Sequence, residues 1–283
     1  MHKTLVSVET LKSQLADPRW VVFDCRSALE DPEWGPAEYR ASHIPGARYA
    51  HLDRDLSAPQ TAGAGRHPLP RPEDFIRWLG DNGVGRDSQV IAYDQGGGAF
   101  AARLWWMMRW VGHPAAAVLD GGWAAWQAAG GPESEDVPAP EPVNFAGRAD
   151  DALWLTSEQL EQALDAGGVT LVDARGAPRY RGETEPIDPV AGHVPGAVNL
   201  PFMGNLDDNG QFRDAESLRR RFEDALGDAA GARVVHMCGS GVTACHNLLA
   251  MEVAGLGESR LYAGSWSEWI TDPRRPVATG DEG

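Results

Sequence analysis

The stretch V-F-D-C-R at residues 22–26 returns as L-V-D-A-R at residues 171–175, and this repetition decides the fold. An H-x-P-G-A element follows each copy, at residues 43–47 and 193–197. Two further pairs keep the same order, namely V-I-A-Y-D (90–94) with V-V-H-M-C (234–238), and L-D-G-G-W-A-A-W (119–126) with L-Y-A-G-S-W-S-E-W (261–269). Because these elements recur in one order along the chain, the sequence predicts a tandem duplication of one domain.

The composition is typical of two globular domains of ordinary size. The chain has 283 residues, of which 42% are hydrophobic and 11 are Trp, enough to build two cores. Acidic residues number 41 against 25 basic ones, a formal net charge of -16, so we expect neither nucleic acid nor an anionic membrane as a partner. No apolar run is long enough to span a membrane, and the N-terminus lacks the apolar core of a secretory signal. We therefore expect a cytoplasmic protein.

Signals for helix and strand alternate within each copy. Apolar runs predict strands at residues 21–24, 89–93, 170–173 and 233–237. Leucines at helical spacing precede the first strand of each copy, and Thr156 and Gln159 have the spacing of a capping box. We therefore expect an α/β fold of two tandem domains, each a mainly parallel sheet flanked by helices.

A segment rich in Pro and acidic residues separates the two copies. Residues 130–142 lack apolar periodicity, which is typical of an extended linker. We place the domains at 1–130 and 150–283, joined by a linker at 131–149. The Trp-rich stretch at 104–110 has helical spacing and is expected to pack in the core of the first domain or at the seam between the domains.

Cys238 stands where chemistry is expected, directly after an apolar strand and before a helical stretch. Ligands of open α/β sheets bind at the edge where strands end and helices begin. Gly239 and Gly241 let the backbone curl so that N–H groups point at one sulfur, and the helix dipole adds a partial positive charge. Both effects favour the nucleophilic thiolate and would stabilise a persulfide anion. The sequence therefore predicts that Cys238 is catalytic.

The remaining cysteines and histidines point to no disulfide, metal or cofactor. Cys25 and Cys245 are expected to be structural, and three cysteines spread over the chain fit no disulfide framework. The eight histidines and three cysteines show no metal-ligand spacing. The glycine run at 96–98 lacks the Lys and Ser/Thr of a phosphate-binding loop, so it is expected to serve a turn or packing. We expect neither a metal nor an organic cofactor.

These motifs together resemble the tandem rhodanese-type sulfurtransferases over nearly the whole chain. The resemblance rests on the duplicated D-x-R and H-[IV]-P-G-A elements, the C-G-S-G-V-T loop (238–243) and the G-S-W-S-E-W segment (264–269). The loop is similar to that of the 3-mercaptopyruvate sulfurtransferase branch, because Gly239 and Ser240 stand where the thiosulfate branch usually carries basic residues. In the first half Asp94 takes the place of the cysteine, which implies a catalytically silent domain.

The resemblance also implies roles for individual residues. Asp53, His67 and Ser240 would form a relay across the domain interface, in which Ser240 passes a proton to the enolate of pyruvate. The guanidinium of Arg179 would hold the carboxylate of the donor. The implied substrate-binding residues are Arg179, Gly239, Gly241, Val242 and Thr243.

The pattern departs from that of the animal members at one position. Those enzymes carry a second arginine a few residues after the first, whereas this chain has Asp188 near that place. Arg181 is the candidate substitute. Arg26 and Arg175, in the D-x-R elements, are expected to pair with nearby carboxylates rather than to bind a ligand.

The expected activity is that of a sulfurtransferase that moves sulfane sulfur from 3-mercaptopyruvate, through a persulfide on Cys238, to a thiol or cyanide acceptor. The alternatives are thiosulfate as the donor, or a non-catalytic persulfide carrier that needs Cys238 but not Ser240, His67 or Arg179. The expected partners are the small-molecule donor and acceptor, with a thioredoxin-like reductant as a further candidate.

A Cys-dependent phosphatase or arsenate reductase is the alternative hypothesis from another class of enzyme. Such sites end their loop with an arginine that clamps the phosphoryl oxygens. Thr243 and Ala244 stand at that place here, which argues against this chemistry.

Overall fold

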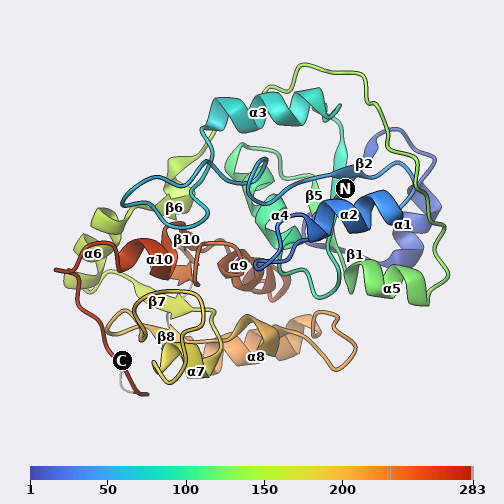
Figure 1. The fold of residues 1–283 in the computed structure, drawn as a ribbon. Helices are drawn as coiled ribbons and strands as arrows, with labels where there is room; N and C mark the ends of the chain where they lie inside the picture. The colour runs from blue at the N-terminus through green and yellow to red at the C-terminus, as the bar shows by residue number, and fades with distance from the viewer. Residues whose placement is uncertain (228, 230, 282–283) are drawn as a thin grey trace. The chain divides into compact units, whose positions relative to one another are not determined.

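The computed structural model describes residues 1–227, 229 and 231–281 and forms two compact α/β units (Figure 1). The first unit consists of Met1–Ala58, Leu69–Asp150 and Asp208–Phe212. The second consists of Pro59–Pro68, Asp151–Asp207 and Arg213–Gly283. The short segment Pro59–Pro68, which follows the first H-x-P-G-A element, thus packs with the second copy of the repeat.

The first unit is a five-stranded parallel sheet with the strand order β1-β5-β4-β2-β3. Its strands are β1 (Leu5–Val6), β2 (Trp20–Asp24), β3 (Arg48–Tyr49), β4 (Gln89–Tyr93) and β5 (Ala116–Leu119). Its helices are α1 (Val8–Gln14), α2 (Trp34–Ala41), α3 (Pro72–Asp81), α4 (Ala101–Trp110) and α5 (Gly122–Ala128). The Trp-rich stretch lies in α4, which is almost wholly buried and packs against β4 and β5, so it belongs to the core of this unit.

The second unit repeats the same order as β6-β10-β9-β7-β8, with all pairs parallel. Its strands are β6 (Trp154–Leu155), β7 (Thr170–Asp173), β8 (Val198–Asn199), β9 (Val234–Met237) and β10 (Arg260–Tyr262). Its helices are α6 (Ser157–Asp165), α7 (Ala177–Tyr180), α8 (Ala215–Leu226), α9 (Ala244–Val253) and α10 (Ser265–Trp269), with 3-10 turns η1 (Asp151–Leu153), η2 (Phe202–Asn205) and η3 (Gly231–Arg233). The predicted α/β class, parallel sheets and tandem arrangement are confirmed, as is the capping box of Thr156 and Gln159 at α6.

A buried ion pair explains why the D-x-R element recurs. Arg26 donates to Asp24 at 2.6 Å, and Arg175 donates to Asp173 at the same distance, with both pairs almost inaccessible to solvent. Each arginine also donates to the carbonyl just before the H-x-P-G-A histidine, at 2.6 Å and 2.8 Å. The expectation that these arginines are structural ion-pair partners agrees with this geometry.

The same arginines connect to the last shared element of the repeat. The guanidinium of Arg26 lies 4.7 Å from the ring centroid of Trp123, and that of Arg175 lies 4.7 Å from the ring centroid of Trp266. A guanidinium over an indole face gains cation–π attraction in a dry interior. Thus one arginine in each copy contacts three shared elements, namely the aspartate of D-x-R, the residue before H-x-P-G-A and the Trp-containing segment.

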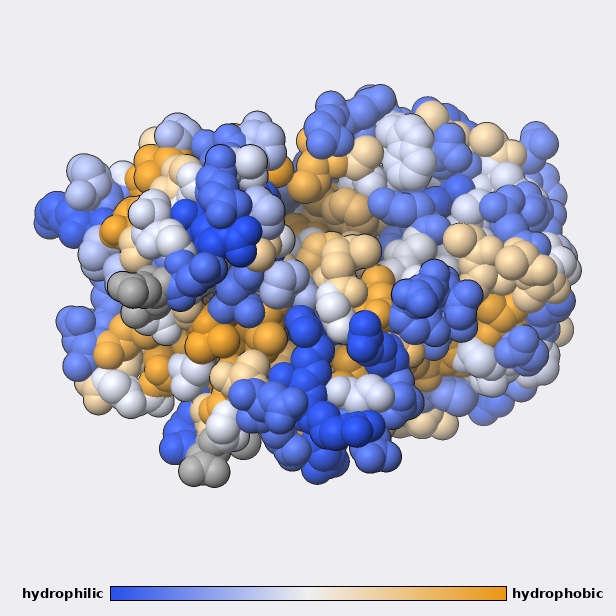
Figure 2. Space-filling view, turned by 90° about the horizontal axis from the view of Figure 1, so that it is seen from below, coloured by the Kyte–Doolittle hydropathy of each residue, from blue (hydrophilic) through white to orange (hydrophobic). Residues whose placement is uncertain are grey.

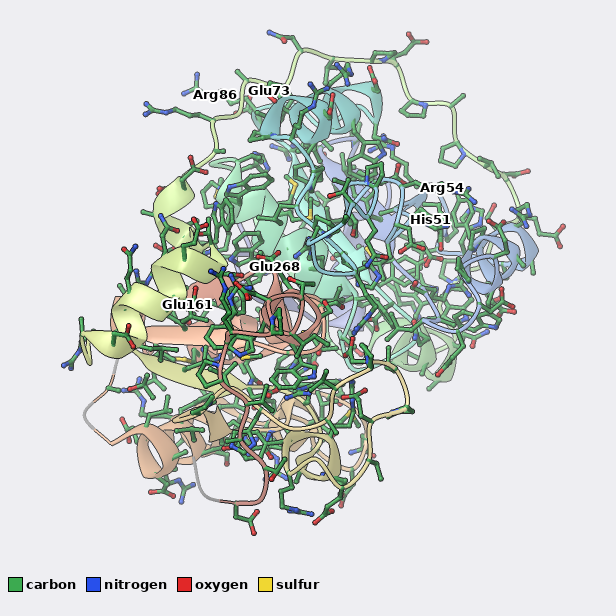
Figure 3. All side chains as sticks on the ribbon, turned by 60° about the vertical axis from the view of Figure 1, so that its left-hand side comes forward. His51, Arg54, Glu73, Arg86, Glu161 and Glu268 are labelled. Carbon is green, nitrogen blue, oxygen red and sulfur yellow. The ribbon has the colours of Figure 1, made fainter. Side chains whose placement is uncertain are left out.

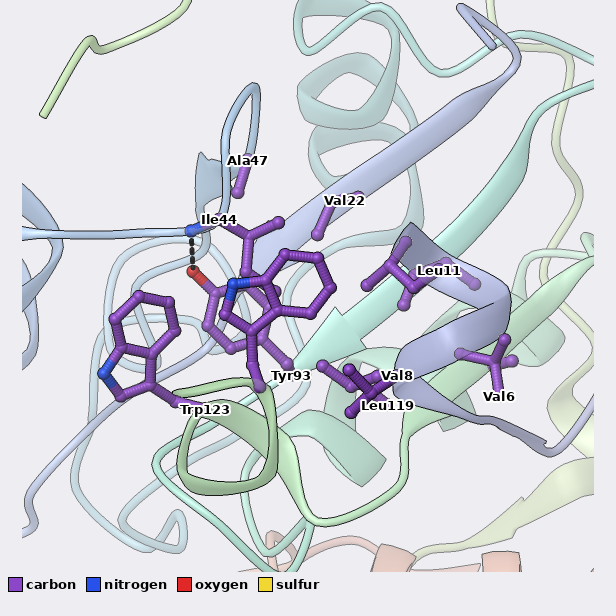
Figure 4. Packing of buried hydrophobic residues seen from close by; sticks show 12 residues of the cluster. Val6, Val8, Leu11, Val22, Ile44, Ala47, Tyr93, Leu119 and Trp123 are labelled. Atoms are coloured by element: carbon purple, nitrogen blue, oxygen red, sulfur yellow. Dashed lines mark hydrogen bonds between the residues drawn. The ribbon is translucent and has the colours of Figure 1, made fainter. Parts of the chain in front are cut away.

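Each unit has its own apolar core. In the first, Val22 of β2, Leu11 of α1 and Trp123 of α5 belong to one buried cluster, where the Tyr93 hydroxyl accepts a hydrogen bond from the Ile44 backbone (Figure 4). The corresponding cluster of the second unit contains buried side chains from β7, β9, β10 and α10. Hydrophilic side chains cover most of the face seen in Figure 2, with apolar ones scattered among them.

The segment between the copies has no helix and almost no strand, but it lies packed along the first unit. The Val143 backbone donates to the Gly80 carbonyl at 2.9 Å, and the Phe145 side chain is buried. Among the residues that the structure describes, no helix is long and apolar enough to cross a membrane.

We predict that Asp24→Asn lowers the free energy of unfolding by about 3–5 kcal/mol, because it leaves the buried Arg26 without its counter-charge. Asp17→Asn is the matched control, since Asp17 and Arg19 form the same i, i+2 pair with Arg19 exposed. The free energy of unfolding of both variants is measured by urea denaturation, with tryptophan fluorescence as the signal. Equal effects of the two variants would contradict the structural role assigned to the buried pair.

We also predict that acid destabilises the second unit through His236, a fully buried residue of β9. Burial lowers the pKa of His236 from 6.5 to about 3. Below about pH 6.5 the His236 ring is protonated in the unfolded chain but stays neutral in the folded chain. The free energy of unfolding therefore falls as the pH falls from about 6.5 toward about 3. Between about pH 7 and about pH 5, the wild type should lose about 2 kcal/mol more than His236→Val in urea denaturation. An equal loss of stability in the wild type and in His236→Val would contradict this role of His236.

Candidate functional site

Cys238 lies at the carboxyl end of β9, in the loop that leads into α9, as the sequence predicts. Its side chain is buried, and the Gly241 backbone N–H donates to its sulfur at 3.2 Å. Gly241 has φ 79, and a Cβ there would lie 2.3 Å from the Ala263 carbonyl oxygen, so only glycine fits. The loop therefore curls tightly enough to aim a backbone donor at the thiol.

The helix α10 holds this loop from the other side. The Trp266 N–H donates to the Cys238 carbonyl at 3.0 Å, and the Ser267 N–H donates to the Gly239 carbonyl at 2.9 Å. The helix is itself anchored, because Glu268 accepts a hydrogen bond from the Ser157 hydroxyl of α6 at 2.6 Å. Figure 3 labels Glu268 on α10 and Glu161 on α6.

Ser265, at the start of α10, is a site residue that the sequence analysis missed. Its hydroxyl accepts a hydrogen bond from the Cys238 N–H at 3.0 Å and donates to the Tyr262 carbonyl. Among the described residues, Ser265 is the one non-glycine residue with a positive φ, which is 52°. In the first copy the same place holds Gly122, with φ 55. The replacement of G-G-W by G-S-W in the repeat was the signal that could have revealed it.

Segment Pro59–Pro68 brings His67 to the loop that carries Cys238. The ring Nδ1 of His67 and the hydroxyl of Ser240 lie 2.7 Å apart, and both side chains are buried. The segment is fixed by its backbone, since the Arg66 N–H donates to the Ser267 hydroxyl at 3.1 Å. A Cβ on Gly65 would lie 2.7 Å from the Gly264 carbonyl oxygen, which shows how closely the two segments approach. Ser240 and His67, predicted as partners, are thus in contact within one unit.

Asp53, the third residue of the predicted relay, belongs to the first unit. It is exposed in the turn after β3, and its backbone N–H donates to the ring of His51 at 3.1 Å. His51 and Arg54, labelled in Figure 3, flank it in the chain. The role of Asp53 in a relay stays a prediction.

Arg179, in α7, lies near the loop that carries Cys238, and its guanidinium pairs with two carboxylates. It donates to Glu185 at 2.7 Å and 3.1 Å and to Asp188 at 3.2 Å. Burial acts to raise the pKa of Glu185, but hydrogen bonds from Arg179 and from backbone N–H groups outweigh it and hold that pKa below its ordinary value. A Cβ placed on Gly239 would lie 3.6 Å from the terminal nitrogens of Arg179, so this cation lies beside the Cys238 loop.

Arg66 is a second arginine at the loop, and the sequence analysis did not single it out. Its guanidinium pairs with Asp188, and a Cβ on Gly239 would lie 2.8 Å from its terminal nitrogen. Burial raises the pKa of Asp188 above its ordinary value, while the charges of Arg66 and Arg179 act to lower it. The signal in the sequence was the basic residue directly before His67.

The other predicted residues have plain structural surroundings. Arg181 donates to Glu183 at 2.8 Å, in an exposed pair. Cys25 and Cys245 are buried, and the Cys245 thiol donates to the Gly241 carbonyl at 3.4 Å. Val242 is buried in the loop, and Thr243 is the N-cap residue of α9. In the described part of the chain, no three His, Cys, Asp or Glu side chains are grouped to hold a metal ion.

The first unit carries the equivalent loop with a carboxylate in place of the thiol. The side chain of Asp94, fully buried, accepts hydrogen bonds from four backbone N–H groups at 2.7 to 3.1 Å, namely those of Gly96, Gly98, Phe100 and Ala101. Burial raises the pKa of Asp94 to about 6, against these donors, which lower it. The backbone donors of this loop are therefore directed at the protein's own side chain.

Comparison with known proteins places both copies in one family. The family model described as a rhodanese-like domain matches twice, at residues 7–129 and 156–272. The chain is 50% identical over 279 residues to a probable 3-mercaptopyruvate sulfurtransferase of Pseudomonas aeruginosa, covering 98% of each chain. It is 40% identical over 264 residues to a putative thiosulfate sulfurtransferase of Mycobacterium tuberculosis, covering 92% of this chain and 90% of that one.

A solved structure shows the same fold. The 3-mercaptopyruvate sulfurtransferase from Leishmania major matches with a TM-score of 0.84 and 31% identity, over 97% of this chain and 75% of that chain.

We predict that substitutions of Ser265 separate its hydrogen bond from its backbone conformation. Both Ser265→Gly and Ser265→Ala remove the acceptor for the buried Cys238 N–H, which costs about 1–3 kcal/mol. Ser265→Ala keeps a Cβ at positive φ, so it should be less stable than Ser265→Gly by about 1 kcal/mol. Thermal denaturation ranks the three proteins. An alanine variant as stable as the wild type would show that the hydroxyl does not hold the loop.

Proposed function

This chain belongs to the rhodanese-like family of sulfurtransferases, and we propose that it takes sulfane sulfur from 3-mercaptopyruvate onto Cys238 and passes it to a thiol or cyanide. The observation that carries the proposal is the 2.7 Å distance between the Ser240 hydroxyl and the ring Nδ1 of His67. Ser240 stands two residues after Cys238 in the chain. A proton relay at this place fits a donor whose carbon must be protonated when sulfur leaves.

Cys238 would act as the nucleophile in a two-step reaction. Its thiolate attacks the sulfur of the donor, the carbon–sulfur bond breaks, and the electron pair goes to the carbon as the enolate of pyruvate. The proton of the donor thiol is lost and the enolate carbon gains one, leaving a persulfide anion on Cys238. Cyanide then attacks the outer sulfur, which leaves as thiocyanate and restores the thiolate. The Gly241 N–H, 3.2 Å from the Cys238 sulfur, supports anionic forms at this atom.

Ser240 and His67 would supply the proton to the enolate. A hydroxyl in hydrogen-bond contact with an imidazole can pass on a proton while the ring replaces it. In the proposal Asp53 orients the ring, as the family resemblance implies. Arg179, beside Gly239, would hold the donor's carboxylate through its planar fork.

The loop of the first unit would transfer no sulfur, because Asp94 offers no sulfur nucleophile and occupies the donors of its own loop. The proposed acceptors are a small thiol or cyanide. A thioredoxin-like reductant in the cytoplasm is the proposed protein partner.

Thiosulfate is the second candidate donor, and one observation favours it. The terminal nitrogen of Arg66 lies beside Gly239, so the loop has a basic neighbour although its own sequence carries none. A dianion would gain from two guanidinium groups at this place.

We predict that the wild type forms thiocyanate from cyanide faster with 3-mercaptopyruvate than with thiosulfate, and that Cys238→Ser forms none with either donor. Steady-state rates at matched donor concentrations decide between the donors. A preference for thiosulfate would replace the proposed donor, and full activity in Cys238→Ser would overturn the proposal.

We further predict that Ser240→Ala and His67→Gln each slow the release of pyruvate from 3-mercaptopyruvate by about 10²–10⁴-fold, the usual contribution of general acid–base catalysis. Arg274→Met is the control and should keep the wild-type rate, because Arg274 is exposed and pairs with Asp272. Sulfur loading at the wild-type rate in both relay variants would favour the non-catalytic carrier instead.

A further inference from the structure

We propose that the first unit has a binding site of its own, a cavity at the carboxyl ends of β2 and β4 that takes a small organic amine in its ammonium form. The cavity has a volume of about 400 Å³. Its lining includes acidic, aromatic and uncharged polar side chains, namely Glu30 and Asp31, Trp34 and Phe100, and Ser27 and Gln95. The inference goes beyond the proposed function and does not depend on it, because the cavity involves no residue of the Cys238 loop.

The cavity lies where open α/β sheets bind their ligands, at the carboxyl edge of the strands. Its walls are tied together by the Gln95 side-chain amide, which donates to the Ser27 carbonyl at 2.9 Å and accepts from the Ser27 N–H at 3.3 Å. Phe100 is fixed as well, because its backbone N–H donates to the buried Asp94 carboxylate at 2.7 Å. The protein's own contacts therefore shape this cavity.

The two copies of the repeat differ in charge at this place. Glu30 stands four residues after the arginine of the first D-x-R element, and Arg179 stands four residues after the arginine of the second. Gln95, which lines the cavity with Glu30, corresponds in the repeat to Gly239, which lies beside Arg179. The described residues that line the cavity include no Lys, Arg or His. A carboxylate thus replaces a guanidinium, which favours a cationic ligand.

Polar groups of the cavity are left for a ligand to bind. Ser27 is only 8% exposed, yet its hydroxyl has no hydrogen-bond partner among the residues that the structure describes. Buried hydroxyl groups normally have such a partner. Within the same described residues the Glu30 carboxylate is also unpaired, and one oxygen of Asp31 accepts only the Glu33 N–H, at 3.1 Å. An ammonium group has three N–H donors, which match the hydroxyl and the two carboxylates.

The aromatic side chains determine the rest of the ligand. Trp34, at the start of α2, is half-buried, and Phe100 is buried. An indole face attracts a cation and also packs against apolar groups. No three His, Cys, Asp or Glu side chains of the described chain are grouped to hold a metal ion. The cavity therefore fits an ammonium group on an aromatic or apolar body.

A matched pair of fluorinated probes tests the site in the full-length protein. The 4-fluorobenzylammonium ion carries the charge, and 4-fluorobenzyl alcohol is its neutral counterpart of similar size. Dissociation constants are measured by ¹⁹F NMR in about 0.15 M salt, which screens the general attraction of cations to an acidic protein. We expect the ammonium ion to bind about tenfold more tightly than the alcohol, as for one ion pair combined with a cation–π contact.

Two variants and a control locate the binding. Glu30→Gln should weaken the binding of the ammonium ion by about threefold to fivefold and leave that of the alcohol unchanged. Trp34→Leu keeps an apolar side chain but removes the indole face, so it should also lower the preference for the cation. Glu73→Gln is the matched control, because Glu73 is an exposed glutamate on α3 of the same unit and does not line the cavity (Figure 3). It should leave both dissociation constants unchanged.

The outcomes are independent of sulfur transfer. A preference for the ammonium ion that falls in Glu30→Gln and persists in Glu73→Gln supports the site, whichever donor the protein uses. Equal affinities for the two probes, no binding of either, or equal falls in Glu30→Gln and Glu73→Gln overturn it. Alkylation of Cys238 with iodoacetamide should leave the preference unchanged, and its loss would place the amine at the loop of the second unit instead and so overturn the proposal.

Discussion

In the second unit, the buried ion pair of Asp173 with Arg175 is the interaction on which the surroundings of the thiol depend. Arg175 receives its counter-charge from the end of β7, donates to the Gly192 carbonyl before the H-V-P-G-A element, and lies under Trp266. The backbone N–H of Trp266 in turn donates to the Cys238 carbonyl. One guanidinium therefore connects the sheet, the loop after α7 and the helix that contacts the Cys238 loop.

The two copies of the repeat share this scaffold and differ in what they place on it. Arg26, Asp24 and Trp123 form the same arrangement in the first unit. The loop donors there are directed at the Asp94 carboxylate, whereas the loop of the second unit directs the Gly241 N–H at a sulfur. Duplication thus kept the interactions that build the unit, while a single change of side chain determines whether the loop offers a nucleophile.

The sequence was sufficient for the fold because its signals are local or repeated. Apolar runs ending at Asp24, Tyr93 and Asp173 are strands in the structure, and the spacing of Thr156 and Gln159 gave a real capping box. Cys238 could be placed for the same reason, since a strand, a glycine loop and a helix follow one another along the chain. The contact of Ser240 with His67 was reached only through the family resemblance, because no local pattern links residues so far apart.

What the sequence could not supply depends on contacts between distant segments. Nothing near Arg66 in the chain shows that it meets Asp188, and Asp188 alone suggested a missing cation rather than a shared one. Ser265 stands out in the repeat because the first copy has Gly122 there, but its role follows from its hydrogen bond with the Cys238 N–H. For both Arg66 and Ser265, the packing of the second unit determines the hydrogen-bond partner, and the hydrophobic periodicity of the sequence does not indicate it.

Sulfur transfer through Cys238 is tested most directly by the mass of each cysteine peptide after exposure of the protein to 3-mercaptopyruvate without acceptor. We predict one added sulfur on the peptide containing Cys238, none on those of Cys25 or Cys245, and removal of this sulfur by cyanide. An unmodified Cys238 peptide, or sulfur on another cysteine, would contradict it.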